Sequence, residues 1–271
     1  MTARTIAFYL PQFHPITENN LAHGKGFTEW TNVTKSQPLF PGHVQPKLPA
    51  DLGFYDLRVL ETREEQASLA RKYGIEGFCY WHYWLGNGRR LLERPFNEVL
   101  NSGKPNFPFC LGWANHDWSG KGWMGGATGE DILQTYPGRE DAKAHFEFLL
   151  SAFKDPRYIR RNGKPVLVIY RPAEIPNCKT YLDYWRELAL ESGLVGLFII
   201  GDAVPGNTSN YGLDGSLYSG QRHLPKDVWD VQTGWDALHS KKLKKVQYSK
   251  VIKHLIPEKG FRDDQFPVII P

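Results

Sequence analysis

The stretch from Ile75 to Trp84 reads IEGFCYWHYW, and it decides the fold of this chain. Ile75, Phe78 and Cys79 make its first half apolar, as in a parallel strand that is covered on both faces. Its second half gathers aromatic rings around His82, and each phenol or indole needs a polar partner if it is buried. Two interpretations are open: a packed aromatic corner of the core, or one wall of a sugar-binding site. We favour the second, because other strands of the chain end in the same way.

The composition is that of a globular domain rich in aromatic residues. The 271 residues are 41% hydrophobic, which is enough to form the core of a single α/β barrel. The net charge of +4, from 33 basic and 29 acidic residues, is a small excess, so nucleic acid is not an expected partner. Trp, Tyr and Phe together make 14% of the chain, which favours a carbohydrate-active protein.

The sequence predicts a cytoplasmic protein. Residues 1–13 contain no long apolar run of the kind found in signal peptides, and no run of 18 apolar residues that would span a membrane occurs. The three cysteines form no CxxC pair, which favours a reducing compartment. The one basic run, residues 241–245, is expected to be the solvated face of a helix. The sequence does not fix the oligomeric state.

Short apolar strands alternate with helices along the chain. The predicted strands are residues 5–10, 75–84, 107–113, 165–170, 195–201, 213–218 and 266–270. The predicted helices are residues 56–73, 93–100, 139–153, 181–191 and 241–255. This alternation predicts an α/β fold with a parallel sheet, and seven strands indicate a (β/α)8 TIM-type barrel that lacks its last βα unit. We expect a single barrel domain over residues 1–271, truncated before its eighth unit. A doubly wound sheet is the alternative, but no strand is followed by GxGxxG or GxxxxGK[ST].

Candidate catalytic residues follow the predicted strands, where the active site of such a barrel lies. Cleavage of a glycosidic bond needs two carboxyl groups beside the anomeric carbon, and Glu29, Asp117 and Asp202 are the candidates. Each has a structural alternative: Glu29 pairs with a nearby lysine, Asp117 caps a helix or an Asx turn, and Asp202 caps a turn. The long segment of residues 11–55, which holds Glu29, contains enough aromatic rings to be ordered.

Further polar and aromatic residues at the same strand ends are candidates for binding a substrate. His82 and His116 are possible acid or base groups, with hydrogen-bonded core histidines as the alternative. Residues 120–126, rich in glycine, form either a lid or a solvent loop. No HExxH or HxH motif occurs, so neither a metal nor another cofactor is expected. The predicted substrate-binding residues are Trp30, Trp81, His82, Trp84, Trp113, Asn115, His116, Trp118, Arg171 and Asp202.

Several long motifs resemble one family. AFYLPQFHP, GKGFTEWTNV, LFPGHVQPKLPADLGFYDL, GIEGFCYWHYW, LLERPFNEVL and RYI-x-x-x-GKPV-x-x-IYRP are similar to the WbsX-type glycosyltransferases, also described as glycoside hydrolase family 99-like domains. The resemblance covers residues 6–200 at least. It implies a barrel of the (β/α)8 type, an oligosaccharide or polysaccharide substrate, and a place in bacterial surface polysaccharide metabolism, such as that of O-antigen lipopolysaccharide.

The chain departs from this family at one informative position. Relatives commonly read W-A-N-E-N-W after the third strand, whereas this chain reads WANHDW, so His116 replaces a glutamate and Asp117 follows it. Relatives also continue beyond the seventh strand, where this chain ends.

The first hypothesis is therefore a carbohydrate-active enzyme that cleaves or transfers a glycosyl unit. Glu29 would act as the acid/base or nucleophile, with Asp117 as its partner. The missing DxD motif favours glycosidase-like chemistry over transfer from a nucleotide sugar. The second hypothesis is a sugar-binding barrel without catalysis, and the third is an inactive, incomplete chain with unpaired strand edges.

Overall fold

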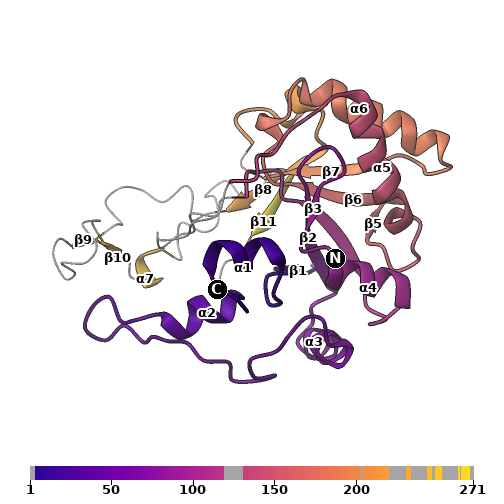
Figure 1. Cartoon of the computed structure of the whole chain (residues 1–271). Coiled ribbons are helices and arrows are strands. Elements are labelled where there is room, and N and C mark those ends of the chain that lie inside the picture. The colour runs from indigo at the N-terminus through magenta and orange to yellow at the C-terminus, as the bar shows by residue number, and fades with distance from the viewer. Residues whose placement is uncertain are drawn as a thin grey trace.

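The structure, a computed structural model, is built on one curled sheet of parallel strands (Figure 1). It describes residues 4–118, 131–202, 204–219, 230–232, 243–245, 248–251, 262 and 264–268. The parallel strands are β1 (Ile6–Tyr9), β2 (Gly77–Trp84), β4 (Phe109–Trp113), β6 (Lys164–Ile169), β7 (Phe198–Gly201), β8 (Gly215–Ser219) and β11 (Gln265–Val268).

The strands lie side by side in the order in which they occur along the chain, from β1 to β11. Each adjacent pair is parallel. In a doubly wound sheet the order of the strands reverses at a switch point, and no such reversal occurs here, so that alternative is wrong. The parallel α/β fold and the predicted strands are confirmed. Among the described residues β1 and β11 are the two edges of the sheet, and an eighth parallel unit is not described.

Short antiparallel strands extend this sheet. They are β3 (Arg90–Leu91), which pairs with the end of β2, and β5 (Arg160–Arg161), which pairs with the start of β6. The described helices are α1 (Thr17–His23), α2 (Glu29–Lys35), α3 (Leu60–Lys72), α4 (Arg94–Ser102), α5 (Arg139–Phe153), α6 (Cys178–Glu191) and α7 (Tyr248–Val251), with the 3-10 turns η1 (Pro172–Glu174) and η2 (Thr208–Tyr211). In Figure 1, α4, α5 and α6 line one side of the strands, and α1 and α2 lie on the other side.

The predicted helix over residues 56–73 begins later than its sequence pattern indicates. The carboxylate of Asp56 accepts hydrogen bonds from the backbone and the guanidinium of Arg58, at 2.9 and 3.0 Å. This local turn competes with helical backbone bonds, so α3 starts only at Leu60. The aromatic segment of residues 11–55 is ordered as expected, and it contains α1 and α2.

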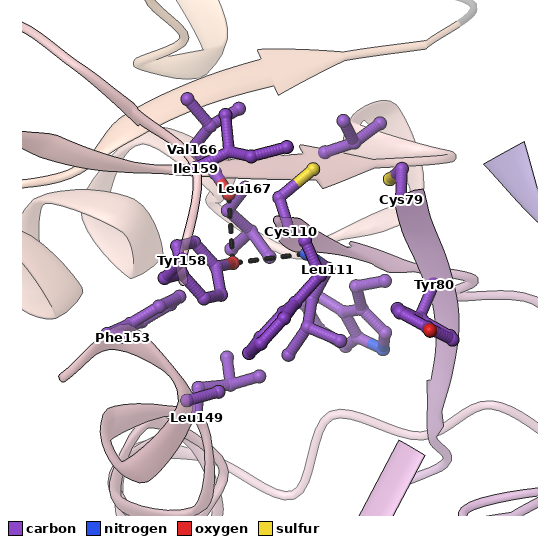
Figure 2. Close-up of a cluster of buried hydrophobic side chains, with 14 of the residues drawn as sticks. Cys79, Tyr80, Cys110, Leu111, Leu149, Phe153, Tyr158, Ile159, Val166 and Leu167 are labelled. Atoms are coloured by element: carbon purple, nitrogen blue, oxygen red, sulfur yellow. Dashed lines mark hydrogen bonds between the residues drawn. The ribbon is translucent and has the colours of Figure 1, made fainter. Parts of the chain in front are cut away.

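Successive residues of each strand point to opposite faces of the sheet, and this alternation determines which side chains share a site. Cys79 and Cys110 are paired across β2 and β4 and lie on the inner face, away from the packed helices. Tyr80 and Leu111, their chain neighbours, face the helices. Figure 2 shows the two sulfurs on one side of the strands and Tyr80 and Leu111 on the other.

Tyr158 joins β4 to β6 on the helix-facing side. Its hydroxyl accepts a hydrogen bond from the Leu111 backbone amide at 3.1 Å and donates one to the Val166 carbonyl at 2.9 Å (Figure 2). The ring is buried against Phe153, with centroids 5.2 Å apart. Burial raises the pKa of Tyr158, so the phenol stays protonated and keeps both bonds.

One predicted helix is observed only in part. Within the range 241–255, Tyr248–Val251 is helical as expected (α7), whereas Leu243–Lys245 is a strand (β10), and the other residues of this range lie outside the described ones. The strand β10 pairs antiparallel with β9 (Asp230–Gln232), so the basic run is not a helix face where it is described. Tertiary pairing here overrides the helical propensity of lysine and leucine. No helix in the described part of the chain is long and apolar enough to cross a membrane.

Candidate functional site

The inner face of the sheet carries a continuous row of aromatic rings, which we call the aromatic platform. Its members are Phe8, Trp81, Tyr170, His116, Tyr83 and Trp118, each in ring contact with the next. Phe8 and Trp81 stack almost in parallel, with centroids 4.9 Å apart and planes 4° apart. Phe8 is 40% exposed, whereas Trp118, at the other end, is only 9% exposed. The platform therefore runs from an open edge of the sheet into a buried corner.

The platform lies directly on the backbone of β4, because Gly112 has no side chain. A Cβ at Gly112 would come within 2.9 Å of the Trp81 indole and 3.3 Å of the Cys79 sulfur. These distances are shorter than van der Waals contact, so any larger residue would displace the indole. Glycine at this position is what allows Trp81 to lie across the neighbouring strand.

A carboxylate at the start of α2 acts electrostatically on a ring of the platform. Burial, with the charge of Glu29, raises the pKa of the Tyr83 phenol to about 12. The backbone amide of Glu29 donates to the Gln12 carbonyl at 3.1 Å, which fixes the start of α2 against the segment that follows β1. One turn further on, the Asn32 amide donates to Glu29 Oε2 at 3.2 Å. The Glu29 carboxylate is thus held by Asn32, and its charge acts on Tyr83.

The segment after β4 is held by backbone contacts and by Asp117. The Oδ1 atom of Asp117 accepts the backbone amide of Gln134 at 2.7 Å, and the residue is otherwise exposed. The backbone of Trp118 exchanges two hydrogen bonds with Ile132, at 2.8 and 2.9 Å. The bond is neither an Asx turn nor a helix cap, because Gln134 is 17 residues away in the chain. The glycines of residues 120–126 lie outside the described residues.

Asn115 is fully buried, and its amide connects two strand ends. It donates to the Arg171 carbonyl and accepts the Arg171 backbone amide, both at 2.8 Å, and it also donates to the Tyr136 hydroxyl at 2.9 Å. Its hydrogen-bonding groups are therefore used within the protein. The Arg171 guanidinium lies 5.3 Å from the centre of the Tyr170 ring and pairs with Glu174 at 2.9 Å. Arg171 is thus a half-exposed cation at the rim of the platform.

Three predicted substrate-binding residues face the helices rather than the platform. His82, Trp84 and Trp113 are 6%, 5% and 1% exposed. The Trp84 ring stacks in parallel on His145, with centroids 4.6 Å apart. The Trp113 indole donates to the Trp84 carbonyl at 3.1 Å and packs against Trp185. These residues form core between the sheet and α5 and α6, so we leave them out of the site.

Of the two remaining predicted residues, Trp30 lies in the long segment, whereas Asp202 follows the strand next to Tyr170, since Gly201 of β7 pairs with Ile169 of β6. Trp30 packs between Phe13 and Tyr55 of the long segment, and its indole donates to the Tyr55 carbonyl at 2.8 Å. Asp202 is buried directly after β7, where its backbone amide donates to the Ile169 carbonyl at 2.7 Å. No group of three or more potential metal-ligating side chains occurs within the described ranges.

The buried histidines of the helix-facing core make the protein sensitive to acid. The Nε2 atoms of His82 and His145 lie 2.9 Å apart, so one donates and the other, which must be neutral, accepts. Burial lowers the His82 pKa to about 3, and burial with the neighbouring His82 lowers the His145 pKa. In the unfolded chain both titrate near pH 6.5. Stability is therefore complete above this pH and decreases as the pH falls below it, because the unfolded state binds the protons first.

We expect the free energy of unfolding to be lower at pH 5 than at pH 7 by about 2 kcal/mol for each of these two histidines. Urea unfolding at a series of pH values measures the slope. His145→Gln keeps a donor beside His82 but removes one titrating group. The slope of the unfolding free energy against pH should therefore correspond to about one proton fewer taken up on unfolding. Identical slopes for the two proteins would contradict a buried neutral pair.

Sequence reasoning missed two central members of the site. Tyr83 and Tyr170 connect His116 to the rest of the platform, yet neither was among the predicted binding residues. The sequence did indicate Tyr83. Residues two apart in a strand point to the same face, and Trp81 was already a predicted substrate-binding residue.

The inner face of the parallel sheet thus carries a row of aromatic rings that is exposed only at the Phe8 end. A sequence model of the family described as Glycosyltransferase WbsX matches residues 5–271. The chain therefore belongs to the WbsX glycosyltransferase family, and the resemblance seen in the sequence motifs is confirmed. Membership of this family indicates a carbohydrate-active enzyme.

The relatives found are not characterised themselves. The uncharacterized protein WxcX of Xanthomonas campestris pv. campestris, in strains B100 and ATCC 33913, is 42% identical over 196 residues. The match covers 72% of this chain but only 28% of WxcX, so the chain corresponds to about a quarter of that protein.

Solved structures with a similar arrangement are glycoside hydrolases. The GH99 endo-alpha-mannosidase from Bacteroides thetaiotaomicron is 15% identical with a TM-score of 0.49, over 80% of this chain and 61% of that one. A glycoside hydrolase-like protein is 16% identical with a TM-score of 0.46, over 79% and 57% of the two chains.

Proposed function

We propose that this chain is a cytoplasmic enzyme of bacterial surface polysaccharide metabolism that acts on a glycosidic bond. The observation that carries the proposal is the aromatic platform, with the charge of Glu29 acting on its Tyr83 ring. Flat apolar rings match the apolar faces of pyranose rings. The Glu29 carboxylate accepts a hydrogen bond from Asn32, and the Glu29 backbone is fixed by the Gln12 carbonyl, so the carboxylate is suited to proton transfer or nucleophilic attack.

In this proposal each neighbouring group has a distinct task. Phe8, Trp81 and Tyr170 are the stacking faces, and Arg171 binds hydroxyl or acidic groups of the sugar at the rim. Asp117, predicted as the partner of Glu29, instead positions the loop through its bond to the Gln134 amide. We favour hydrolysis of the glycosidic bond over transfer from a nucleotide sugar, since the sequence contains no DxD motif.

The stacking role of Trp81 can be tested by binding. Trp81→Ala should weaken the affinity for a bound oligosaccharide about tenfold or more, because one face of the sugar loses its ring contact. Isothermal titration with a panel of bacterial surface oligosaccharides measures the change. Tyr73→Ala is the matched control, since Tyr73 is 72% exposed at the end of α3, outside the platform. Equal affinities of the Trp81→Ala variant and the unaltered protein would refute a platform that stacks on sugars.

A second candidate is a sugar-binding barrel without turnover. This candidate is favoured by the position of Asp117. Its carboxylate binds the Gln134 backbone amide, and catalysis of the predicted type would need it as the second carboxylate beside Glu29. Binding of oligosaccharides without release of product across the same panel would support this candidate. Release of a reducing sugar would support the enzyme.

A further inference from the structure

His116 is held in one tautomer. Its Nδ1 atom lies 2.8 Å from the backbone carbonyl of Asp117. A carbonyl oxygen only accepts hydrogen bonds, so Nδ1 carries the hydrogen and donates it. In the neutral ring the other nitrogen, Nε2, then has a free lone pair and is ready to accept a proton.

The ring of His116 belongs to the platform and is half-buried there. It contacts Tyr170 at 5.5 Å and Tyr83 at 6.2 Å between ring centres, with both pairs close to edge-on. The His116 backbone amide donates to the Ala114 carbonyl at 3.0 Å, in a tight turn directly after β4. The imidazole therefore lies in the row of rings on which the proposed function places a sugar.

Charged and titratable groups surround this imidazole on several elements. The charge of Glu29 on α2 acts on the Tyr83 phenol, and His116 contacts the ring of the same Tyr83. Asp117 is the next residue in the chain. The Arg171 guanidinium lies against Tyr170, the other ring that His116 contacts.

Other candidate bases near the platform are less suitable. The pKa of Tyr83 is raised to about 12 by its burial, so its phenol remains protonated near neutral pH. His82 and His145 are buried on the opposite face of the sheet, where they bind each other. Among the described residues, His116 is the imidazole on the inner face.

We propose that His116 is the general base of this site and that Glu29 is the general acid, an inference that rests on the proposed function. His116 Nε2 takes a proton from the attacking water as the oxygen of that water bonds to the anomeric carbon. The bond from this carbon to the leaving oxygen breaks, and protonated Glu29 gives its proton to that oxygen. The imidazolium and the Glu29 carboxylate then exchange one proton through solvent, which restores both groups. A sugar hydroxyl in place of water gives transfer by the same route.

The test separates loss of the base from loss of the acid. The probes are 4-nitrophenyl and 2,4-dinitrophenyl glycosides, which differ in how much acid assistance their leaving groups need. His116→Asn keeps a donor to the Asp117 carbonyl but has no group at the position of Nε2. We expect kcat to fall about 100-fold or more with both glycosides, and KM to change little. Azide, which needs no base, should restore turnover and yield the glycosyl azide.

The matched control and a measurement without turnover complete the test. His23→Asn changes a histidine on α1 outside the platform and should leave kcat unchanged. Nitrogen-15 NMR of the unaltered protein should show His116 protonated at Nδ1, and an Nε2–H form would overturn the proposal. Full activity of His116→Asn, or no rescue by azide, would also overturn it while leaving the proposed function intact. An unaltered protein that releases product from none of the glycosides would overturn both.

Discussion

Replacing Glu29 with glutamine is expected to reduce turnover of a glycan substrate by about 10²- to 10⁴-fold, the range that general acid–base catalysis contributes. The side chain keeps its size, and the glutamine oxygen can still accept the hydrogen bond from Asn32. Because Glu29 is only partly buried at the start of α2, the melting temperature should stay within a few degrees. Release of reducing sugar and thermal melting of the same preparation measure the two effects.

Two controls make this result specific to Glu29. Glu61→Gln changes an exposed carboxylate in the first turn of α3 and should leave turnover unchanged. Asp117→Asn should have a small effect, because an amide oxygen can still accept the Gln134 hydrogen bond. Full activity of Glu29→Gln would remove it from the mechanism. A large loss in Asp117→Asn would instead make Asp117 the partner carboxylate that the sequence predicts.

Trp113→Ala should be the most destabilising single substitution considered for this protein, at about 3–5 kcal/mol of unfolding free energy. The indole is 1% exposed and packs against His145 and Trp185, with centroids 4.7 and 5.7 Å away. Its removal leaves a large cavity between the sheet and α6. It also removes the donor to the Trp84 carbonyl, which would then be buried without that bond.

The comparison with Trp81 tests the two faces of the sheet directly. Both tryptophans are predicted sugar contacts, but only Trp81 lies on the platform. Urea unfolding followed by circular dichroism should show a smaller loss for Trp81→Ala than for Trp113→Ala, since Trp81 is only half-buried. Binding should show the reverse order once both variants are measured in folded form. Similar losses of stability in the two variants would contradict the assignment of the faces.

Much of the fold follows from local sequence patterns. Continuous apolar strands such as residues 165–170 are typical of a parallel sheet that is covered on both faces, and the parallel pairing is confirmed. Glycine and proline mark the ends of most elements, so their existence was predictable even where boundaries moved by a few residues. The segment 241–255 differs because part of it pairs with β9, and the pattern of its own residues gives no sign of that partner. Where such a strand pair forms, it outweighs the local helical propensity.

The site was harder to predict than the fold. The run from Trp81 to Trp84 alternates between two faces, so its four rings cannot form one wall. Which pair faces inward is not readable from β2 alone, because both faces of this strand are aromatic and nearly all of it is buried. Asn115 shows the same difficulty. An amide after a strand is equally suited to a sugar hydroxyl or to a neighbouring strand, and here the register places Arg171 beside it.

Gly112 gives the platform a property that side chains alone would not provide. With nothing between the Trp81 indole and the peptide plane of β4, the ring is supported by hydrogen-bonded main chain rather than by mobile rotamers. Under the proposed function, this surface is preorganised, and a sugar that binds it does not need to immobilise the ring first. Selectivity among sugars is then expected to depend on the groups around the platform rather than on Trp81 itself.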